Sequence, residues 1–412
     1  MREMKNSGIE WIGAIPRGWQ LSKIGNLYTQ RNEKVSDKDY QPLSVTMQGI
    51  LPQLATAAKT DDGDNRKLVR VGDFAINSRS DRRGSCGISP LDGSVSLINI
   101  ILTPRTAMHP GYYNWLFHTT LFADEFYKWG HGIVADLWTT RWQEMKSITV
   151  PVPEYAEQER IAAFLDAECA EIDAVLEKTR ASIEEYKKLK QAVITQAVTK
   201  GIRGDRPMKD SGIEWIGDIP VEWDVIRNAF LYKEKSRLPE ENAVSLSLSQ
   251  VDGLIATDDM KERSLKTSTY DGWKQVRTND LVLNRFKGHL GVLFAANIEG
   301  MVSFHYGVYE PLRQFDSKFF EYLYHSDVYK AILGLKSNGM TIGLQNLSNQ
   351  NFYSVYSLYP PEAEQQEIIQ YLDDKCSGID ALIVQKQEHL TEIENYKKSL
   401  IYEYVTGKKE VV

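Results

Sequence analysis

The chain has 412 residues, of which 42% are hydrophobic and 25% charged, and its formal net charge is −7. These values exclude a disordered, collagen-like or disulfide-rich chain and leave room for two or more domains, and no apolar run approaches the ~20 residues that span a bilayer. Because the first residues also lack the apolar core of a signal peptide and the three cysteines are widely spaced, we expect a cytoplasmic protein.

The chain contains two copies of one unit. Residues 4–19 return as residues 208–223, with twelve identities at an offset of 204. Further along the offset becomes 207, and residues 157–176 match residues 364–383 with nine identities in twenty. An internal repeat of this length predicts two similar structural units in tandem.

The first part of each copy predicts a head that mixes strands and helices. Short apolar runs at 68–76 and 94–102, bounded by Gly, Asn and Asp, are typical of β-strands. Residues 112–127 and 319–335 are better explained as helices. We therefore expect α/β heads of the α+β kind.

The last part of each copy predicts one long amphipathic helix. Residues 157–200 contain no Pro or Gly, and apolar residues recur at steps of three and four, as they do in the second copy. Such a narrow stripe cannot be buried by one helix alone, so we expect the two helices to pair. The predicted seam consists of Ile161, Leu165, Cys169, Ile172, Leu176, Ile368, Leu372, Cys376, Ile379 and Ile383.

The order head, helix, head, helix predicts an antiparallel coiled coil with pseudo-two-fold symmetry. Parallel pairing would require the link at 201–208 to cross a helix of ~65 Å, whereas so short a link reaches at most ~28 Å. Antiparallel pairing would place the heads at opposite ends. The predicted domains are residues 1–153 (head), 154–207 (helical spacer), 208–360 (head) and 361–412 (helical spacer).

The sequence contains none of the common catalytic or nucleotide-binding motifs. GxxxxGK[ST], GxGxxG, HExxH and CxxC are absent, as are the Asn-Pro-Pro-Tyr/Phe and Asp-Pro-Pro-Tyr sequences of DNA aminomethyltransferases. His118 and His325 occupy equivalent positions beside aromatic residues and are best explained as structural. We therefore expect a binding protein with no catalytic residue and no metal site.

Two segments of each copy are candidates for contacting DNA. The first follows a predicted strand, and Arg or Lys in such a loop can bind phosphates or guanine edges in the major groove. A merely solvated loop is the alternative. The candidate residues are Arg79, Arg82 and Arg83 in the first copy and Arg285, Lys287 and His289 in the second.

The second segment precedes the long helix and contains glycine. Its polar side chains differ between the copies while the surrounding pattern is kept, as expected of surfaces that read different sequences, although drift of a plain loop would give the same pattern. The candidate residues are His131, Thr139, Thr140 and Arg141 in the first copy and Lys336, Asn338, Gln345, Asn346 and Ser348 in the second.

The charge is distributed unevenly between the heads. Residues 1–150 carry 18 Lys and Arg against 15 Asp and Glu, whereas residues 208–358 carry 16 against 19. An acidic chain can bind DNA through local patches, but the nonspecific electrostatic contribution is then modest. This favours a protein whose partners supply part of the grip on DNA.

The pattern Ser-Gly-Ile-Glu-Trp-Ile-Gly, with Ile-Pro and Trp after it, opens both copies at 7–19 and 211–223. It resembles the specificity subunit of Type I restriction–modification enzymes. The helix entry, a proline followed by Glu-Gln and then Leu-Asp at 153–166, is similar to the same family, although the second copy has an extra Gln366. The resemblance covers essentially the full chain and the order of its parts.

The resemblance implies a non-catalytic subunit whose two heads are target-recognition domains, each reading one half of an asymmetric bipartite DNA target. It also implies that the helices set the gap between the half-sites and dock two modification (methyltransferase) subunits, with restriction (endonuclease/translocase) subunits as further partners. S-adenosylmethionine, ATP and Mg²⁺ would belong to those partners. The residues alone leave two alternatives open: a coiled-coil scaffold or adaptor without DNA specificity, and a nuclease or methyltransferase, which the missing motifs disfavour.

Overall fold

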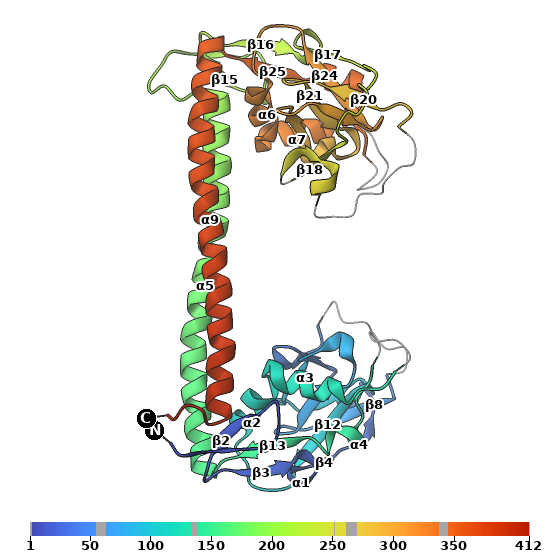
Figure 1. The fold of residues 1–412 in the computed structure, drawn as a ribbon, viewed down its shortest axis with the longest axis vertical. Coiled ribbons are helices and arrows are strands. Elements are labelled where there is room, and N and C mark those ends of the chain that lie inside the picture. The colour runs from blue at the N-terminus through green and yellow to red at the C-terminus, as the bar shows by residue number, and fades with distance from the viewer. Residues whose placement is uncertain are drawn as a thin grey trace. The chain divides into compact units, whose positions relative to one another are not determined.

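The computed structural model describes residues 2–54, 63–132, 138–250, 252–260, 270–337 and 345–411. The chain divides into two compact units, one formed by Met1–Arg180 with Glu388–Val412 and the other by Ala181–Gln387. Each unit combines one head with parts of both long helices (Figure 1).

The first head is built from short strands that pair antiparallel and from short helices. Its largest sheet has the strand order β10-β9-β12-β4, a second sheet has the order β11-β8-β5, and β13 pairs with β3. The strands are β1 (Met4–Asn6), β2 (Ala14–Pro16), β3 (Gln20–Lys23), β4 (Tyr28–Gln30), β5 (Lys34–Val35), β6 (Leu43–Thr46), β7 (Gly49–Pro52), β8 (Arg66–Val69), β9 (Phe74–Asn77), β10 (Cys86–Ile88), β11 (Gly93–Val95), β12 (Asn99–Pro104) and β13 (Thr149–Val152). The helices are α1 (Ile24–Leu27), α2 (Pro110–Phe117), α3 (Thr120–Lys128) and α4 (Trp142–Met145).

The second head repeats this topology. Its largest sheet has the order β22-β21-β24-β17, which matches β10-β9-β12-β4 strand for strand, and β25 pairs with β16 as β13 does with β3. The strands are β14 (Met208–Asp210), β15 (Asp218–Pro220), β16 (Asp224–Arg227), β17 (Tyr232–Glu234), β18 (Leu246–Ser249), β19 (Gly253–Ala256), β20 (Lys274–Val276), β21 (Leu281–Asn284), β22 (Leu293–Ala295), β23 (Gly300–Val302), β24 (Tyr306–Pro311) and β25 (Tyr356–Tyr359). The helices are α6 (Ser317–His325), α7 (Asp327–Lys336) and α8 (Asn349–Tyr353), with a 3₁₀ helix η5 (Arg285–Leu290) after β21. The predicted mixed heads are confirmed.

A core rich in aromatic side chains fixes the helices of each head on its largest sheet. In the first head the ring of Phe117 lies 4.4 Å from Phe74 of β9 and 4.7 Å from Phe122 of α3. In the second head the ring of Phe320 of α6 lies 5.8 Å from that of Tyr232 of β17. Close ring pairs of this kind add to the stability gained by burial.

The head helices correct one sequence-based prediction. Residues 112–127 and 319–335 each form two helices, because Thr119 and Ser326 adopt extended backbone angles and begin a new helix. The Thr119 hydroxyl accepts a hydrogen bond from Phe122 N at 3.2 Å, which is the N-cap arrangement that threonine favours. The predicted strand runs are confirmed as strands, and each contains two strands joined by a turn, with Gly72 at φ +86° in the first turn.

The two long helices are confirmed as α5 (Tyr155–Lys200) and α9 (Glu362–Val405). In the first unit Lys397 Nζ lies 2.6 Å from Asp173 Oδ1, and Arg180 Nη2 lies 2.8 Å from Glu394 Oε1. Since the residue number falls in α9 as it rises in α5, the helices pair antiparallel there.

The second unit has the same antiparallel pairing. Lys190 Nζ lies 2.6 Å from Asp380 Oδ2, and Lys386 lies over the ring of Tyr186. The ion pair of Lys190 with Asp380 is the repeat equivalent of Lys397 with Asp173 at the offset of 207, so the two copies pair their helices by the same rule.

The predicted seam residues do more than join the helices. Ile161 and Leu165 are buried in one cluster with the aromatic core of the first head and with Leu400 and Val405 from the end of α9. In the second unit the corresponding cluster contains Ile368, Leu372 and Cys376 together with Ile194 and Val198 of α5. The other predicted seam residues, Cys169, Leu176 and Ile379, are buried, and Ile172 and Ile383 are half-buried. Each head therefore packs on the start of its own helix and on the end of the other copy's helix.

The two ends of the chain lie together in the first unit, where Arg2 Nε is 4.0 Å from Glu410 Oε2 (Figure 1). Across the described ranges, none of the helices combines the length and the apolar character that crossing a bilayer requires.

Candidate nucleic-acid interface

The two segments predicted to contact DNA lie side by side in the first head. Thr140 N donates to Ser78 O at 2.9 Å, and Ser80 N donates to Trp138 O at 2.9 Å. Arg79 and Thr139 also form an isolated antiparallel bridge. The two separate predictions therefore describe one surface.

The second head builds the same contact at equivalent positions. Leu347 N donates to Arg285 O at 2.9 Å, and these residues correspond to Thr140 and Ser78 at the offset of 207. Thr140 and Leu347 are both fully buried, although one is polar and the other apolar. The backbone contact is therefore part of the architecture of the head, while the side chains around it vary.

The three arginines of the first segment differ in whether they have an acidic partner. Arg79, Arg82 and Arg83 are all exposed. Arg83 is paired with Asp124, and Arg82 Nε lies 3.8 Å from Asp81 Oδ2. Arg79 has no ion pair with any residue that the structure describes, so it is the residue most available to a phosphate or a base.

The other predicted residues of the first head fall into two groups. His131 and Arg141 are exposed, and Thr139 is half-buried. Thr140 is fully buried, and its hydroxyl donates to Phe126 O at 2.9 Å. Thr140 thus holds the loop in place and does not present its side chain at the surface.

The predicted residues of the second head are also unequal. Lys287 is exposed, and His289 is half-buried. The guanidinium of Arg285 is occupied inside the head, where Nη2 pairs with Glu234 and donates to Asn349 Oδ1 at 2.9 Å.

The remaining predictions in the second head concern its second segment. Lys336 and Asn346 are exposed, and Gln345 is half-buried. Ser348 caps α8, since its hydroxyl accepts from Asn351 N at 3.2 Å. Asn338 lies outside the described residues.

A third segment, which the sequence-based prediction missed, completes the surface in both heads. It is the turn after β11 at 96–98 and the turn after β23 at 303–305. Ser78 Oγ donates to Ile98 O at 2.5 Å, and the rings of Phe286 and His305 lie 5.5 Å apart. The available signal was the repeat offset, which aligns 96–98 with 303–305, together with the large apolar residues Leu97, Ile98 and Phe304 in these turns.

The repeat-equivalent histidines His118 and His325 are half-buried, and the three cysteines are buried. Burial lowers the pKa of His118 and brings that of His325 to about 4, which favours the neutral ring at both positions. Burial likewise raises the pKa of Cys86 to about 12 and that of Cys169 to about 11. Within the described ranges no cluster of three or more His, Cys, Asp or Glu is arranged to hold a metal ion.

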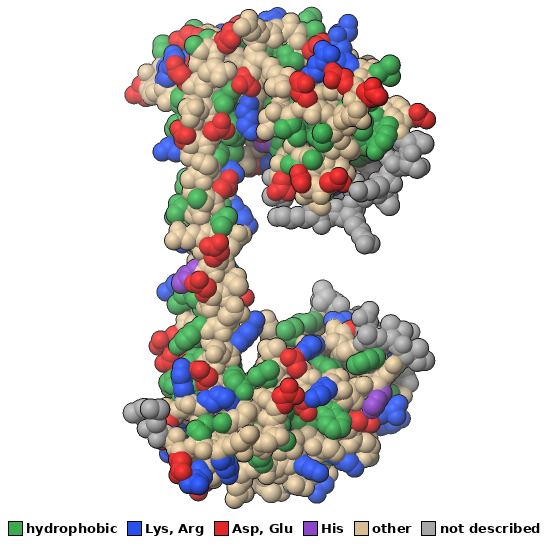
Figure 2. All heavy atoms as spheres, in the orientation of Figure 1, with side chains coloured by type: hydrophobic (Ala, Val, Ile, Leu, Met, Phe, Trp, Pro, Cys, Tyr) green, Lys and Arg blue, Asp and Glu red, His purple; other side chains and the backbone are tan. Residues whose placement is uncertain are grey.

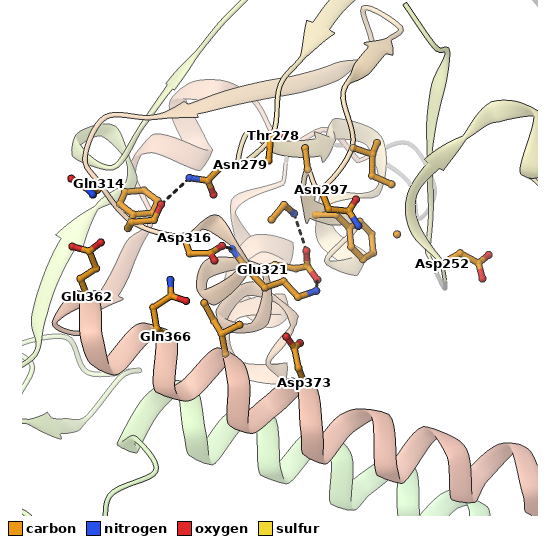
Figure 3. A pocket seen from close by; sticks show the side chains of 18 residues that line it. Asp252, Thr278, Asn279, Asn297, Gln314, Asp316, Glu321, Glu362, Gln366 and Asp373 are labelled. Carbon is orange, nitrogen blue, oxygen red and sulfur yellow. Dashed lines mark hydrogen bonds and ion pairs between the residues drawn. The ribbon is translucent and has the colours of Figure 1, made fainter.

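The second unit contains a cavity of about 730 Å³ beside the start of α9 (Figure 3). The charged side chains of its lining are five carboxylates and one lysine, and the carboxylate of Glu321 accepts hydrogen bonds from Ala295 N at 2.8 Å and Lys318 Nζ at 2.5 Å. The acidic residues that line it are Asp252, Asp316, Glu321, Glu362 and Asp373. Because like charges repel, this lining disfavours phosphate, so the loop surface is the better nucleic-acid site.

Fold and site together define a class of two-headed protein, in which each head is held by both long helices and carries a surface of three loops. A chain from a structure on complex assembly and conformational transition of the type I R-M system has this fold, with 13% sequence identity, a TM-score of 0.71, and coverage of 96% of this chain and 99% of that chain.

Two further solved chains align with this one. The HsdS subunit from Thermoanaerobacter tengcongensis is 16% identical, with a TM-score of 0.49, and the alignment covers 96% of this chain and 98% of that chain. The Type-I restriction-modification system S subunit from M. genitalium is 12% identical, with a TM-score of 0.38 and coverage of 94% and 96%. No protein-family model and no curated protein matches the chain.

Proposed function

We propose that this chain is the specificity subunit of a Type I restriction–modification enzyme and that it recognises DNA without catalysing a reaction. The observation that carries the proposal is the loop surface. One backbone hydrogen bond builds it in both heads, between Thr140 and Ser78 and between Leu347 and Arg285. A shared frame with variable side chains is what a sequence-reading surface requires.

The side chains on this frame support two different half-sites. Arg79 corresponds to Phe286, and Arg141 corresponds to Ser348. Arginine pairs with guanine edges, whereas an aromatic ring makes apolar contacts such as that with the thymine methyl group. Each head therefore reads its own half of an asymmetric bipartite target.

The long helices take the roles of spacer and docking surface in this proposal. α5 is continuous over 46 residues, and a stiff spacer keeps two half-sites at a fixed separation on DNA whose turns repeat every ~34–36 Å. Two modification subunits dock on the helices, and restriction subunits complete the complex in the cytoplasm. The fold shared with a chain from a type I R-M complex supports partners of this kind. S-adenosylmethionine, ATP and Mg²⁺ are bound by those partners.

The test is the map of methylated adenines in cells that carry this chain and its modification subunit. We expect methylation at one asymmetric bipartite sequence, which disappears in matched cells that lack only this chain. A scaffold without DNA specificity would leave the methylated sequence unchanged between the two strains. Methylation or cleavage of DNA by the purified chain alone would contradict the non-catalytic role.

A further inference from the structure

The second head carries an exposed row of aromatic side chains beside its basic loop. Phe286 is 45% exposed and Phe304 is 55% exposed, and His305 lies between them, with ring centroids 5.5 Å from Phe286 and 3.9 Å from Phe304. These three residues are called the aromatic strip below. They come from η5 and from the turn after β23, so two separate segments of the chain create the strip.

The strip continues toward the turn before β20. A side-chain carbon placed on Gly272 would lie 3.6 Å from Phe304 Cβ, which puts this turn against Phe304. The turn also holds Tyr270, which is 56% exposed, with its ring 5.1 Å from that of Trp273. Figure 2 shows hydrophobic side chains gathered on the face of this head that carries β20.

A row of exposed aromatic rings indicates a binding site. Isolated exposed apolar residues are ordinary, but contiguous apolar patches usually mark a binding surface, because water solvates them poorly. Phe286 and Phe304 are not needed for the core of the head, since the buried clusters of this unit are complete without them.

The surroundings of the strip favour DNA over a protein partner. Residues 284–290 and 303–306 include Arg285, Lys287, His289 and His305 and no Asp or Glu, and the adjoining turn at 270–273 adds one exposed acid, Asp271. Lys287 is exposed and follows Phe286 directly. The centre of a protein interface is depleted in charge, whereas rings interleaved with cations suit bases flanked by phosphates.

The first head has other side chains at the positions equivalent to Phe286 and Phe304, on the corresponding surface. Phe286 corresponds to Arg79, and Phe304 corresponds to Leu97, which is 38% exposed. The charge of the heads changes in parallel, since the first is net basic and the second is net acidic. A head with little positive charge gains little from phosphate attraction.

We propose that the aromatic strip is the base-contacting part of the second head. This inference rests on the proposed function and deepens it. Phe286 and Phe304 make apolar contacts with base edges of one half-site, and Lys287 binds a neighbouring phosphate. Binding affinity that comes from the aromatic strip depends on the base sequence and hardly changes with salt concentration. Binding affinity that comes from Lys287 does not depend on the base sequence and falls as the salt concentration rises.

The experiment compares two variants of the full chain in complex with its modification subunits. The DNA probes are a duplex with the mapped target and two duplexes in which one or the other half-site is scrambled, measured at three salt concentrations. Phe286→Ala with Phe304→Ala should weaken binding to the intact target at least tenfold, with an unchanged slope of log affinity against log salt. The ratio of specific to nonspecific binding should fall, and the loss should be confined to one half-site.

Lys287→Ala should weaken binding to all three duplexes and reduce the salt slope by about one. Leu312→Ala is the matched control, because Leu312 is also exposed in this head but follows the far end of β24, ~20 Å along the strand direction from His305. It should leave binding unchanged. Leu97→Ala should affect the other half-site only.

If the folded double variant binds DNA as tightly as the wild type, the inference is overturned and the proposed function is unaffected. If the double variant unfolds, Phe304→Ala alone serves as the same test. Loss of the modification subunits with unchanged DNA binding would identify the strip as a protein interface and would also overturn it. If the wild-type complex fails to prefer the mapped target, the proposed function fails first and the inference with it.

Discussion

Three arginines of one loop illustrate how much neighbouring acids matter at the scale of single residues. Arg83 is paired with Asp124 and Arg82 lies near Asp81, whereas Arg79 has no ion pair with a described residue. An arginine that already has an acidic partner must give up that interaction before it can bind a phosphate. Equal exposure therefore does not mean equal availability.

Replacing Arg79, Arg82 and Arg83 together with Ala should weaken DNA binding at one half-site, and Arg79→Ala should account for most of the loss. If Arg79 contacts a guanine directly, losing that contact would weaken the binding free energy by about 1–3 kcal/mol. Affinity is to be measured at low salt for the single and triple variants. Arg83→Ala is the internal control and should have the smaller effect. Unchanged affinity of the triple variant would remove this loop from the reading surface.

A second residue-scale feature fastens each head to the start of its long helix. In the second unit Glu364 is 2% exposed, pairs with Arg206, and accepts from Trp223 Nε1 at 3.0 Å. In the first unit Glu157 pairs with Arg2 and accepts from Trp19 Nε1 at 2.8 Å. Both copies thus use one carboxylate to hold an arginine and a tryptophan.

This arrangement predicts that acid destabilises the second unit. Burial favours the neutral acid, but hydrogen bonds from Arg206 and Trp223 outweigh it and lower the pKa of Glu364. Since the folded pKa is the lower one, the stabilisation is present above the unfolded pKa of ~4.3 and is lost as pH falls through the folded pKa. The free energy of unfolding in urea, measured between pH 7 and pH 3, should fall across this window.

Glu364→Gln should remove this acid dependence and cost about 1–3 kcal/mol at pH 7, because Arg206 then keeps only its more exposed partner Glu222. Glu157→Gln is the matched variant in the first unit, where the pair is more exposed, and should cost less. If the two variants lose the same free energy of unfolding, then burial does not determine how much each ion pair stabilises its unit.

At the scale of elements, the sequence predicted the long helices well. The start of α5 lies within two residues of the predicted start because the apolar spacing persists over the whole segment and prolines precede it. The head helices were joined wrongly because the periodicity continues across Thr119 and Ser326, whose capping roles depend on the local backbone. The contact of Ser78 with Thr140 was not predictable, since it joins segments 62 residues apart and follows from strand pairing.

The helix contacts refine a prediction about the gap between half-sites. Leu189 and Leu382 lie at matching heights, as the contacts of Lys190 with Asp380 and of Lys386 with Tyr186 indicate. Inserting seven residues after each should keep the seam in register and lengthen the spacer by ~10 Å, or about 3 base pairs. Mapping of methylated adenines should then show a changed gap with unchanged half-sites.

The single insertion after Leu189 is the control for register. It shifts the seam of one helix only, and it should therefore destabilise the second unit instead of producing a clean new gap. Altered half-site sequences in the double insertion would contradict the spacer role of the helices.

At the scale of the whole molecule, the chain ends meet inside one compact unit. Arg2 lies close to Glu410, and residues 203–205 are exposed in the other unit. A circular permutant opened between Gly204 and Asp205, with a short linker joining the old ends, should therefore fold and keep its DNA specificity. Circular dichroism and binding to the mapped target measure this. An unfolded permutant would show that the chain order itself is required.

The packing of each head against both helices also fixes when each unit can be completed during synthesis. The second unit needs only residues 181–387, but the first needs Glu388–Val412 as well. Trp11 and Trp19 belong to the buried cluster that Leu400 and Val405 complete, so during synthesis that cluster stays incomplete until residues 400–405 have been added. The head made first is thus the last to mature, and a prematurely stopped product would expose its aromatic interior to chaperones and proteases.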